Sequence, residues 1–494
     1  MELEWVLSIS LGICLVLVSA WKWKHKEVRF PPGPMPLPFL GNLLQLNPKD
    51  LPKSLLALSH KYGPVYTLYL GPRRVVVLCG HEALKEALVD HGEQFCGRGK
   101  IAPVERTFKG LGIVMANGER WKKLRHFTLV TLKNFGMGKC SIEERIQEEA
   151  QYLLEKFRKT KGLPFDPTYL LNCTTSNIIC SIVFGRRFEY EDKTFLSMLD
   201  LTNKLFFELS TPWAKVRSCY DMYSGIMQYL PGGDSRIYNP LQELKALIDE
   251  RIKINQETLD LKNPRDFIDC FLIEMEKEKG NPSPEFTVNS LALTALNLFT
   301  AGTDTVSSTL KYALLLMMKY PEVEEKVHQE IDNVIGRNRV PAVKDRVNMP
   351  YTNAVIHEIQ RLVDILPAGL PHKVTEDTEF RGYLLPKDTN IITLLGSALH
   401  DPQYFSDPEI FNPQHFLDEE GCFKKIDAFV PFSSGKRACV GESMARMELF
   451  LYFTTILQSF SLKSSLTPTD IDITPQQNGF LNVPPIYELC LIPR

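Results

Sequence analysis

One cysteine is surrounded in the sequence by residues that could make its thiol a ligand or a nucleophile. Cys439 lies within FSSGKRACVGESMARMELF, residues 432–450, and apolar residues recur at helical spacing after Gly441. The thiol is therefore expected at or just before the amino end of a helix, where backbone N–H groups favour a thiolate. Glycines at 435 and 441 let the backbone turn and allow a flat group to approach closely.

The residues around Cys439 are consistent with several uses. No nucleophile motif surrounds it, and zinc would need further ligands nearby. A thiolate beside glycines, Phe432 and Arg437 suits an axial ligand to haem. A buried structural cysteine fits these residues alone equally well.

A second stretch lies in the long apolar segment from Thr287 to Lys319, which ends before Pro321 and predicts a buried helix. Within it, Gly302 costs about 1 kcal/mol relative to alanine, and Thr305 can bond back to a carbonyl and bend the helix. Polar residues inside an apolar core indicate a pocket for water or oxygen.

Together these stretches resemble the cytochrome P450 family. FSSGKRACVGE is similar to its haem-binding signature, and AGTDT (residues 301–305) resembles its oxygen-activation segment. EIQR (residues 358–361) resembles its E-x-x-R pair, and FNPQHF (residues 411–416) the segment that completes that pair. GYLLPKDT, NGFLNVPP and the amino terminus resemble vertebrate microsomal members of family two, with a likeness to the drug- and fatty-acid-oxidising subfamily C.

The resemblance implies a fold and site roles. The fold would be mainly α-helical with a minor β-sheet region. Haem b would be ligated by Cys439, beside Phe432. The resemblance implies that the haem carboxylates are held by Arg437, Trp121, Arg125, Arg98 and His372. Thr305 and Asp304 would sustain proton delivery during oxygen activation. Glu358, Arg361 and His415 would be structural, and His415 stands where much of the family has arginine.

An apolar substrate requires a dry, apolar pocket. The family's pocket positions correspond to Val114, Met115, Phe206, Asn297, Ala301, Leu366, Ala368, Phe480 and Leu481. Ordinary core packing would explain each of them equally well. Xenobiotics, fatty acids such as arachidonic acid, and steroids are the substrate classes that the family implies.

Electrons must come from outside, because the chain shows no flavin fingerprint and no iron–sulfur spacing. The resemblance implies NADPH–cytochrome P450 reductase, with cytochrome b5 as a further partner. A basic face could dock an acidic reductase. The lysines that flank the proximal elements are Lys122, Lys123, Lys133, Lys139, Lys424, Lys425 and Lys436.

The amino terminus predicts a membrane anchor. Residues 5–21 carry no charge and are bounded by Trp5 and Trp21, with acidic residues before them and basic residues after. We expect residues 1–21 to be a retained single-pass signal anchor, 22–42 a basic and proline-rich linker, and 43–494 a cytosolic haem-thiolate domain at the endoplasmic reticulum. The Asn172-Cys173-Thr174 sequon would then carry no glycan.

Composition and pattern set the remaining bounds. The net charge of −2 gives no global sign of nucleic-acid binding, and the 11 cysteines, odd in number, favour a reducing compartment. Residues 65–78 predict a β-hairpin, and short strands are expected near residues 388–395 and toward the carboxyl end.

Four functions follow from these residues. The leading one is a monooxygenase. The alternatives are a haem-thiolate isomerase or dehydratase acting on peroxides, a non-catalytic haem protein, and a membrane-anchored thiol hydrolase. The unbroken AGTDT segment speaks against the isomerase.

Overall fold

The structure is a computed structural model of the whole chain, and it describes residues 30–38, 40–137, 140–211 and 235–494. The predicted anchor, residues 1–21, and most of the basic part of the linker lie outside the described residues. Among the described helices, none combines the length and the apolar character that a membrane crossing requires.

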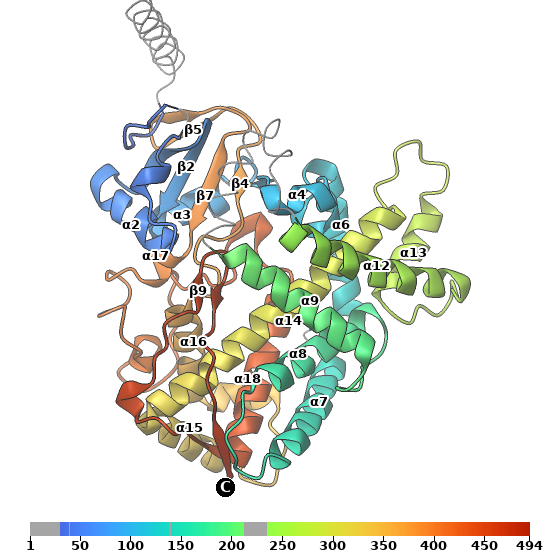
Figure 1. Cartoon of the computed structure of the whole chain (residues 1–494), viewed down its shortest axis with the longest axis vertical. Helices are drawn as coiled ribbons and strands as arrows, with labels where there is room; N and C mark the ends of the chain where they lie inside the picture. Colours follow the sequence, from blue (N-terminus) through green and yellow to red (C-terminus); the bar gives the residue numbers. More distant parts are fainter. Residues whose placement is uncertain (1–29, 39, 138–139, 212–234) are drawn as a thin grey trace, which may run out of the picture.

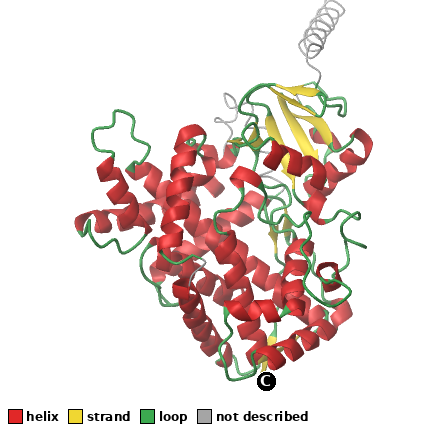
Figure 2. Cartoon of the chain, turned by 180° about the vertical axis from the view of Figure 1, so that it is seen from behind, coloured by secondary structure: helices red, strands yellow, loops and turns green. Residues whose placement is uncertain are grey.

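The protein is mainly helical, with a small sheet gathered at one end (Figures 1 and 2). The described helices are α2 (Leu51–Tyr62), α3 (His81–Lys85), α4 (Ala102–Phe108), α5 (Gly112–Met115), α6 (Gly118–Asn134), α7 (Cys140–Arg158), α8 (Thr168–Val183), α9 (Lys193–Ser210), α12 (Ser235–Glu257), α13 (Phe267–Lys277), α14 (Val288–Lys319), α15 (Pro321–Val334), α16 (Pro350–Val363), α17 (Gly396–Leu399) and α18 (Glu442–Ser459). Short helical turns are η1 (Leu43–Gln45), η2 (Glu86–Asp90), η4 (Val343–Asn348), η5 (Pro413–Phe416), η6 (Gly435–Arg437) and η7 (Pro468–Asp470).

The predicted hairpin is confirmed as β1 (Val65–Leu70) and β2 (Arg73–Cys79), which pair in antiparallel fashion. The main sheet has the order β1-β2-β7-β4-β3. Its other strands are β3 (Gly97–Arg98), β4 (His372–Lys373) and β7 (Asn390–Leu394). Smaller pairs are β5 (Thr378–Phe380) with β6 (Tyr383–Leu385), β8 (Phe460–Lys463) with β11 (Cys490–Pro493), and β9 (Gln477–Asn478) with β10 (Asn482–Val483).

The long central helix is α14, which crosses the helical part beside α8, α16 and α18 (Figure 1). It begins where predicted, with the Thr287 side chain accepting a hydrogen bond from the Ser290 N–H at 3.2 Å. Pro321 opens α15, since proline fits the first turn of a helix but not its interior. Buried residues occupy all sides of α14 over most of its length, so the prediction of a buried helix is confirmed.

The apolar core is divided between the two structural regions. One large cluster joins the helices around α14, and a smaller one lies beneath the sheet, built on residues such as Val76, Phe95 and Ile391. Asn172 of the sequon is buried in α8, and its amide donates to Asn203 at 3.1 Å. A glycan could not be attached there without opening the core.

Candidate active site

Cys439 lies in a tight loop between η6 and α18, three residues before α18 begins. The Cys439 N–H donates to the Phe432 carbonyl at 3.0 Å, which closes the loop. Gly435 has φ of +68°, and a Cβ there would lie 1.7 Å from the Leu88 carbonyl oxygen. Only glycine lets this loop pack against η2 and present the thiol.

The environment of the Cys439 sulfur differs in part from the expectation. The sulfur is accessible, yet protein surrounds it on nearly all sides. Burial raises the pKa of the thiol above its ordinary value, while the backbone N–H groups of Gly441 and Glu442 and the charge of Arg125 oppose this. Burial therefore works against the thiolate that the helix end favours.

One face of α14 belongs to the same region. Thr305 Oγ1 donates to the Ala301 carbonyl at 2.8 Å, the back-bond expected from the sequence. Ala301 is exposed although α14 is otherwise largely buried, so this face opens onto a hollow. Thr305 and Phe432 line a common cavity of about 40 Å³, which brings α14 and the Cys439 loop together.

Asp304 and Gly302 occupy other faces of α14. Burial raises the pKa of the Asp304 carboxyl to about 7, and Lys311 lowers it in part. Asp304 does not line the cavity shared by Thr305 and Phe432. A Cβ at Gly302 would lie 3.2 Å from the Ile179 side chain, so this glycine allows close packing on α8. Helix packing explains Gly302 without the polar pocket that the sequence suggested.

Arg437 is buried next to the Cys439 loop. Its guanidinium lies 3.8 Å from the centre of the Trp121 ring, and it donates to the carbonyls of Cys96 at 2.8 Å and Ala116 at 2.7 Å. The remaining nitrogen, Nη1, is buried and has no hydrogen-bond partner among the described residues. Burial, together with the charges of Arg98 and Arg125, lowers the pKa of Arg437 to about 8.

Two further arginines complete what we call the arginine cluster: Arg98, Arg125 and Arg437. Arg98 is buried, and its side chain donates to the carbonyls of Val114, Leu370 and Pro371. Arg125 Nη2 donates to the Ala438 carbonyl at 2.7 Å, next to Cys439. Trp121 and Arg125 both lie on α6, four residues apart as predicted.

His372 joins the cluster through the sheet. Antiparallel pairing of β3 with β4 sets Arg98 directly opposite His372. His372 Nδ1 lies 2.7 Å from the Phe95 carbonyl oxygen, which indicates that this nitrogen carries the proton. Burial lowers the pKa of His372 to about 3, and the charge of Arg98 adds to this.

The charge balance of this region fits a haem. None of the three arginines forms an ion pair with a carboxylate within the described parts of the chain. Buried cations are costly unless they meet an anion. Haem carries two carboxylates, which could pair with these arginines, and Thr305 and Phe432 line a cavity between α14 and the Cys439 loop. The residues present therefore suit the cofactor that the sequence resemblance implies.

The structure brings several pocket candidates together. Asn297 Oδ1 accepts a hydrogen bond from the Val114 N–H at 3.2 Å. The rings of Phe206 and Phe480 stack with centres 6.3 Å apart. Met115 and Leu481 are buried, and Leu366 and Ala368 are half-buried in the loop between α16 and β4.

Glu358, Arg361 and His415 form a closed network. Arg361 donates twice to the Glu358 carboxylate, both at 2.7 Å, and also to the carbonyls of Leu399, Pro408 and Ile410. His415 Nδ1 lies 3.2 Å from the Glu358 carboxylate. These bonds tie α16 to the chain around residues 399–415, and none of the three side chains lines the cavity of Thr305 and Phe432.

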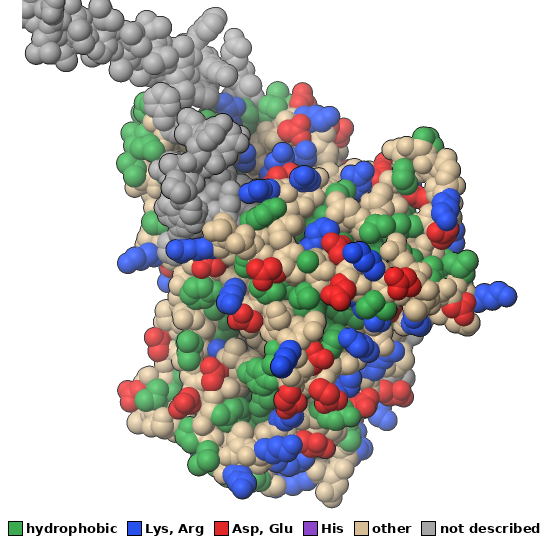
Figure 3. Space-filling model, turned by 45° about the vertical axis from the view of Figure 1, so that its right-hand side comes forward, with side chains coloured by type: hydrophobic (Ala, Val, Ile, Leu, Met, Phe, Trp, Pro, Cys, Tyr) green, Lys and Arg blue, Asp and Glu red, His purple; other side chains and the backbone are tan. Residues whose placement is uncertain are grey.

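The lysines that flank this region are exposed, and several are already paired. Lys122 lies 2.9 Å from Glu119, Lys123 lies 3.6 Å from Glu278, and Lys436 contacts Glu93. Lys133, Lys424 and Lys425 are exposed without an ion pair among the described residues, and Lys139 lies outside those residues. Positive and negative side chains are interspersed over the face that Figure 3 shows.

Sequence reasoning missed Asn117. Its Oδ1 accepts from the Arg98 N–H at 2.6 Å, and its Nδ2 donates to the Arg98 carbonyl at 3.1 Å. Asn117 therefore fixes the backbone of an arginine that lies 19 residues earlier. The Asn-Gly pair just before WKKLR was the available signal, because it marks a turn that leads into a helix.

Comparison with known proteins agrees with this geometry. The family model described as Cytochrome P450 matches residues 31–491. Cytochrome P450 2G1 of Oryctolagus cuniculus is 62% identical, and the match covers 100% of both chains. Cytochrome P450 2C23 of Rattus norvegicus is 53% identical over 100% of both chains, and Cytochrome P450 2A13 of Homo sapiens is 54% identical over 99% of both.

These matches confirm the predicted family-two resemblance and the mainly helical fold. The cofactor is haem with an axial cysteine thiolate, and the reaction uses dioxygen and NADPH-derived electrons to oxidise xenobiotics or lipids. The chain belongs to the cytochrome P450 family of haem-thiolate monooxygenases.

Proposed function

We propose that Cys439 is the axial ligand and that the arginine cluster, with Trp121 and His372, holds the haem carboxylates. The observation that carries this proposal is the buried positive charge that meets no carboxylate among the described residues, next to an accessible sulfur. Phe432 packs on the same side, where its carbonyl anchors the Cys439 backbone. When bound, thiolate-ligated haem supplies the activation of dioxygen that the oxidation of a C–H bond requires.

Thr305 and Asp304 have different parts in this proposal. The Thr305 hydroxyl lies on the cavity face of α14, where it can pass a proton between water and the oxygen site. Asp304 lies one residue earlier, and its pKa of about 7 lets it exchange protons at neutral pH. It does not face the cavity itself, so a water or a side-chain rotation would have to connect it to Thr305.

The substrate is an apolar small molecule held above this face. Ala301 lies one turn before Thr305, and Asn297 one turn before Ala301, so the three share a side of α14. Val114 is tied to Asn297, and the Phe206–Phe480 pair supplies aromatic surface. Together with Met115, Leu366, Ala368 and Leu481, these residues would select an apolar xenobiotic, a fatty acid or a steroid.

The family generally takes electrons from NADPH–cytochrome P450 reductase. For this chain we propose that Lys133, Lys424 and Lys425 contribute most of the docking charge, because the other described lysines of the set are paired with acids. Cytochrome b5 would use the same face. Residues 1–21 would anchor the chain in the endoplasmic reticulum membrane, with residues 43–494 in the cytosol.

The deciding experiment is a difference spectrum of the reduced protein with and without carbon monoxide. A Soret band at the position of a thiolate-ligated haem is expected, and it should disappear in Cys439→Ser. A haem spectrum that survives unchanged in this variant would refute the ligand assignment. Oxygen and NADPH consumption with reductase would then separate a monooxygenase from a peroxide isomerase or a haem carrier.

A further inference from the structure

A second cavity lies apart from the residues assigned to haem and substrate. It has a volume of about 210 Å³ and lies between α2, α14, α16 and the segment around β9 and β10. None of the cofactor or substrate residues named above lines it. An engineered cavity of about 150 Å³ holds benzene, so this one has room for a ring-sized apolar group and a polar head.

Asp364 is the unusual residue of this cavity. It follows the last residue of α16 with φ of 44° and is only 6% exposed. Its backbone is held, since its N–H donates to Gln360 and its carbonyl accepts from the Asn482 amide. No described residue donates a hydrogen bond to its carboxylate or pairs with it. A carboxylate in such a place requires a positive partner.

The other charged groups of the cavity already have partners. Asp50 accepts from Asn478 at 3.2 Å and lies 3.5 Å from the Lys53 ammonium. His400 Nδ1 lies 3.3 Å from Glu409, which is exposed and marks the side open to solvent. Asp364 is therefore the acid of this cavity whose carboxylate has no hydrogen bond or ion pair among the described residues, although the charge of His400 acts on it across the cavity.

Arg361 is the cation on α16 near Asp364, in addition to His400 of the cavity wall. It lies one turn earlier on α16, and its guanidinium is fully occupied by Glu358 and three carbonyls. Burial raises the pKa of Asp364 to about 6, and the charges of His400 and, to a smaller extent, Arg361 lower it in part. The carboxyl is mostly ionised at neutral pH.

Most of the remaining wall is apolar, with Ser397, Asn478 and Asn482 as polar exceptions. It includes Leu56 from α2, Leu316 and the Tyr312 ring from α14, and Ile473 before β9. An aromatic face attracts organic cations, and aliphatic side chains accommodate their apolar substituents. The Asp364 carboxylate and the largely apolar wall together suit an organic cation with an apolar substituent.

We propose that this cavity is a binding site for a small organic cation, a protonated or quaternary amine carrying an apolar group, with its positive centre beside the Asp364 carboxylate. The site is separate from the oxidation site. It would allow an amine to bind this protein while another molecule occupies the haem pocket.

The test uses the full-length, haem-loaded protein and phenyltrimethylammonium. This quaternary nitrogen has no lone pair, so it cannot ligate the haem iron. Isothermal titration calorimetry should detect binding to the wild type, while benzenesulfonate, of similar size and opposite charge, should not bind. Asp364→Asn should weaken phenyltrimethylammonium binding by at least about tenfold, since a close charge pair is lost.

Two further variants keep this test decisive. Asparagine tolerates the left-handed backbone of residue 364. Asp407→Asn is the matched control, because Asp407 also has a left-handed backbone (φ 47°) but is exposed and does not line the cavity. The Asp407→Asn variant should bind phenyltrimethylammonium as tightly as the wild type. Leu56→Trp should fill part of the cavity from α2 and abolish binding without altering charge. Equal affinity in the wild type, Asp364→Asn and Leu56→Trp, or no binding to the wild type, would overturn the proposal.

Discussion

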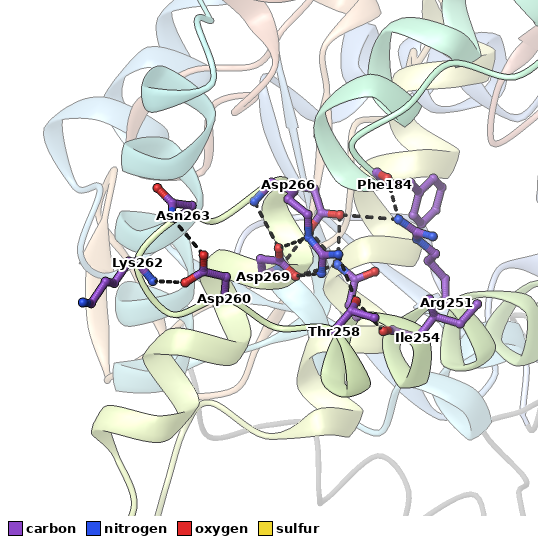
Figure 4. Close-up of polar contacts among 11 residues, drawn as sticks. Phe184, Arg251, Ile254, Thr258, Asp260, Lys262, Asn263, Asp266 and Asp269 are labelled. Atoms are coloured by element: carbon purple, nitrogen blue, oxygen red, sulfur yellow. Dashed lines mark hydrogen bonds and ion pairs between the residues drawn. The ribbon is translucent and has the colours of Figure 1, made fainter.

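Buried charge is handled in opposite ways in two regions of this protein. At the turn from α12 to α13, Asp269 accepts two hydrogen bonds from the Arg265 guanidinium, at 2.6 and 2.9 Å, and one from Asn255 at 2.7 Å (Figure 4). Asp266, at the start of α13, accepts from the same Asn255 amide. In the arginine cluster, by contrast, no described carboxylate forms an ion pair with any of the three guanidinium groups.

The difference separates structural charge from charge kept for a ligand. A closed network such as the α12–α13 turn offsets the cost of burial within the chain. A network without a carboxylate keeps the cost of burial until an anionic ligand binds. Binding of the ligand then also stabilises the folded protein. Removing a charge should therefore affect stability in the first region and haem retention in the second.

The largest effect is expected at the closed network. Asp269→Ala removes the acceptor of Arg265 and Asn255 and should lower the free energy of unfolding by about 2–4 kcal/mol. Denaturant midpoints of the haem-loaded protein would measure the change. Asp260→Ala removes an exposed acid of the same loop that accepts only from its neighbours Lys262 and Asn263, and should lower the free energy of unfolding much less than Asp269→Ala does. Faster haem loss in Asp269→Ala without a shifted midpoint would contradict the distinction.

The open network should respond through the cofactor. Arg437→Gln should speed haem dissociation by about 10- to 100-fold, equivalent to about 1.4–2.7 kcal/mol, because a charge-assisted bond to a carboxylate is lost. Transfer of haem to an excess of apomyoglobin would give the rate. Arg337→Gln removes an exposed arginine that pairs with Asp332 and serves as the control. A normal dissociation rate in Arg437→Gln would refute its role toward the haem.

Local sequence patterns predicted the features whose residues lie close together in the sequence. The extent of α14, the hairpin of β1 and β2, and the position of Cys439 just before α18 all follow from periodicity, caps and glycines. The one-sided placement of Trp121 and Arg125 follows from helix geometry. These features depend on neighbours within a few residues, so one sequence suffices to find them.

Long-range pairings could not be predicted in this way. Arg98 meets His372 only because β3 pairs with β4 across more than half of the chain, and Arg437 reaches the carbonyls of Cys96 and Ala116 through packing of distant loops. The family resemblance supplied Arg98 and His372, whereas Asn117 and Asp364 had no such guide. The Asn-Gly pair marks a turn at Asn117 but does not identify Arg98 as its partner, and no local pattern singles out Asp364.

Asp364 is a buried negative charge without an ion pair among the described residues, so it tests the distinction between structural charge and charge kept for a ligand. Its folded pKa of about 6 lies above the ordinary 3.8, so the folded protein binds more protons than the unfolded chain between about pH 4 and pH 6. Stability of the wild type therefore falls as pH rises through that window. The full shift corresponds to roughly 3 kcal/mol, and water in the cavity should reduce it to about 1–2 kcal/mol.

Asp364→Asn removes this loss. In denaturant midpoints, the stability of the variant relative to the wild type should rise between pH 4.5 and pH 7.5, by up to the about 1–2 kcal/mol given above. Asp407→Asn, the exposed left-handed aspartate, should track the wild type at both pH values. A difference between Asp364→Asn and the wild type that is equal at both pH values would show that the carboxylate carries no unpaired charge.

The smallest effect is expected at two exposed lysines that are already paired with acids. Lys122 and Lys123 contact Glu119 and Glu278 on the exposed side of α6, and such pairs are individually weak. Reversing both to glutamate should slow reductase-supported turnover by only about two- to fivefold, chiefly through slower association at low salt. Peroxide-supported turnover should be unchanged, since it needs no docking.

Lys204→Glu in α9 is a suitable control for this reversal, because Lys204 pairs with Asp200 at a comparable exposure but lies outside the proposed docking set. Equal loss of reductase- and peroxide-supported turnover in the double variant would mean that the lysines act on the fold. A loss well above fivefold would mean that Lys122 and Lys123 break their ion pairs with Glu119 and Glu278 and contact the reductase instead. The positive charge of this surface, like that of the arginine cluster, would then act mainly on a binding partner.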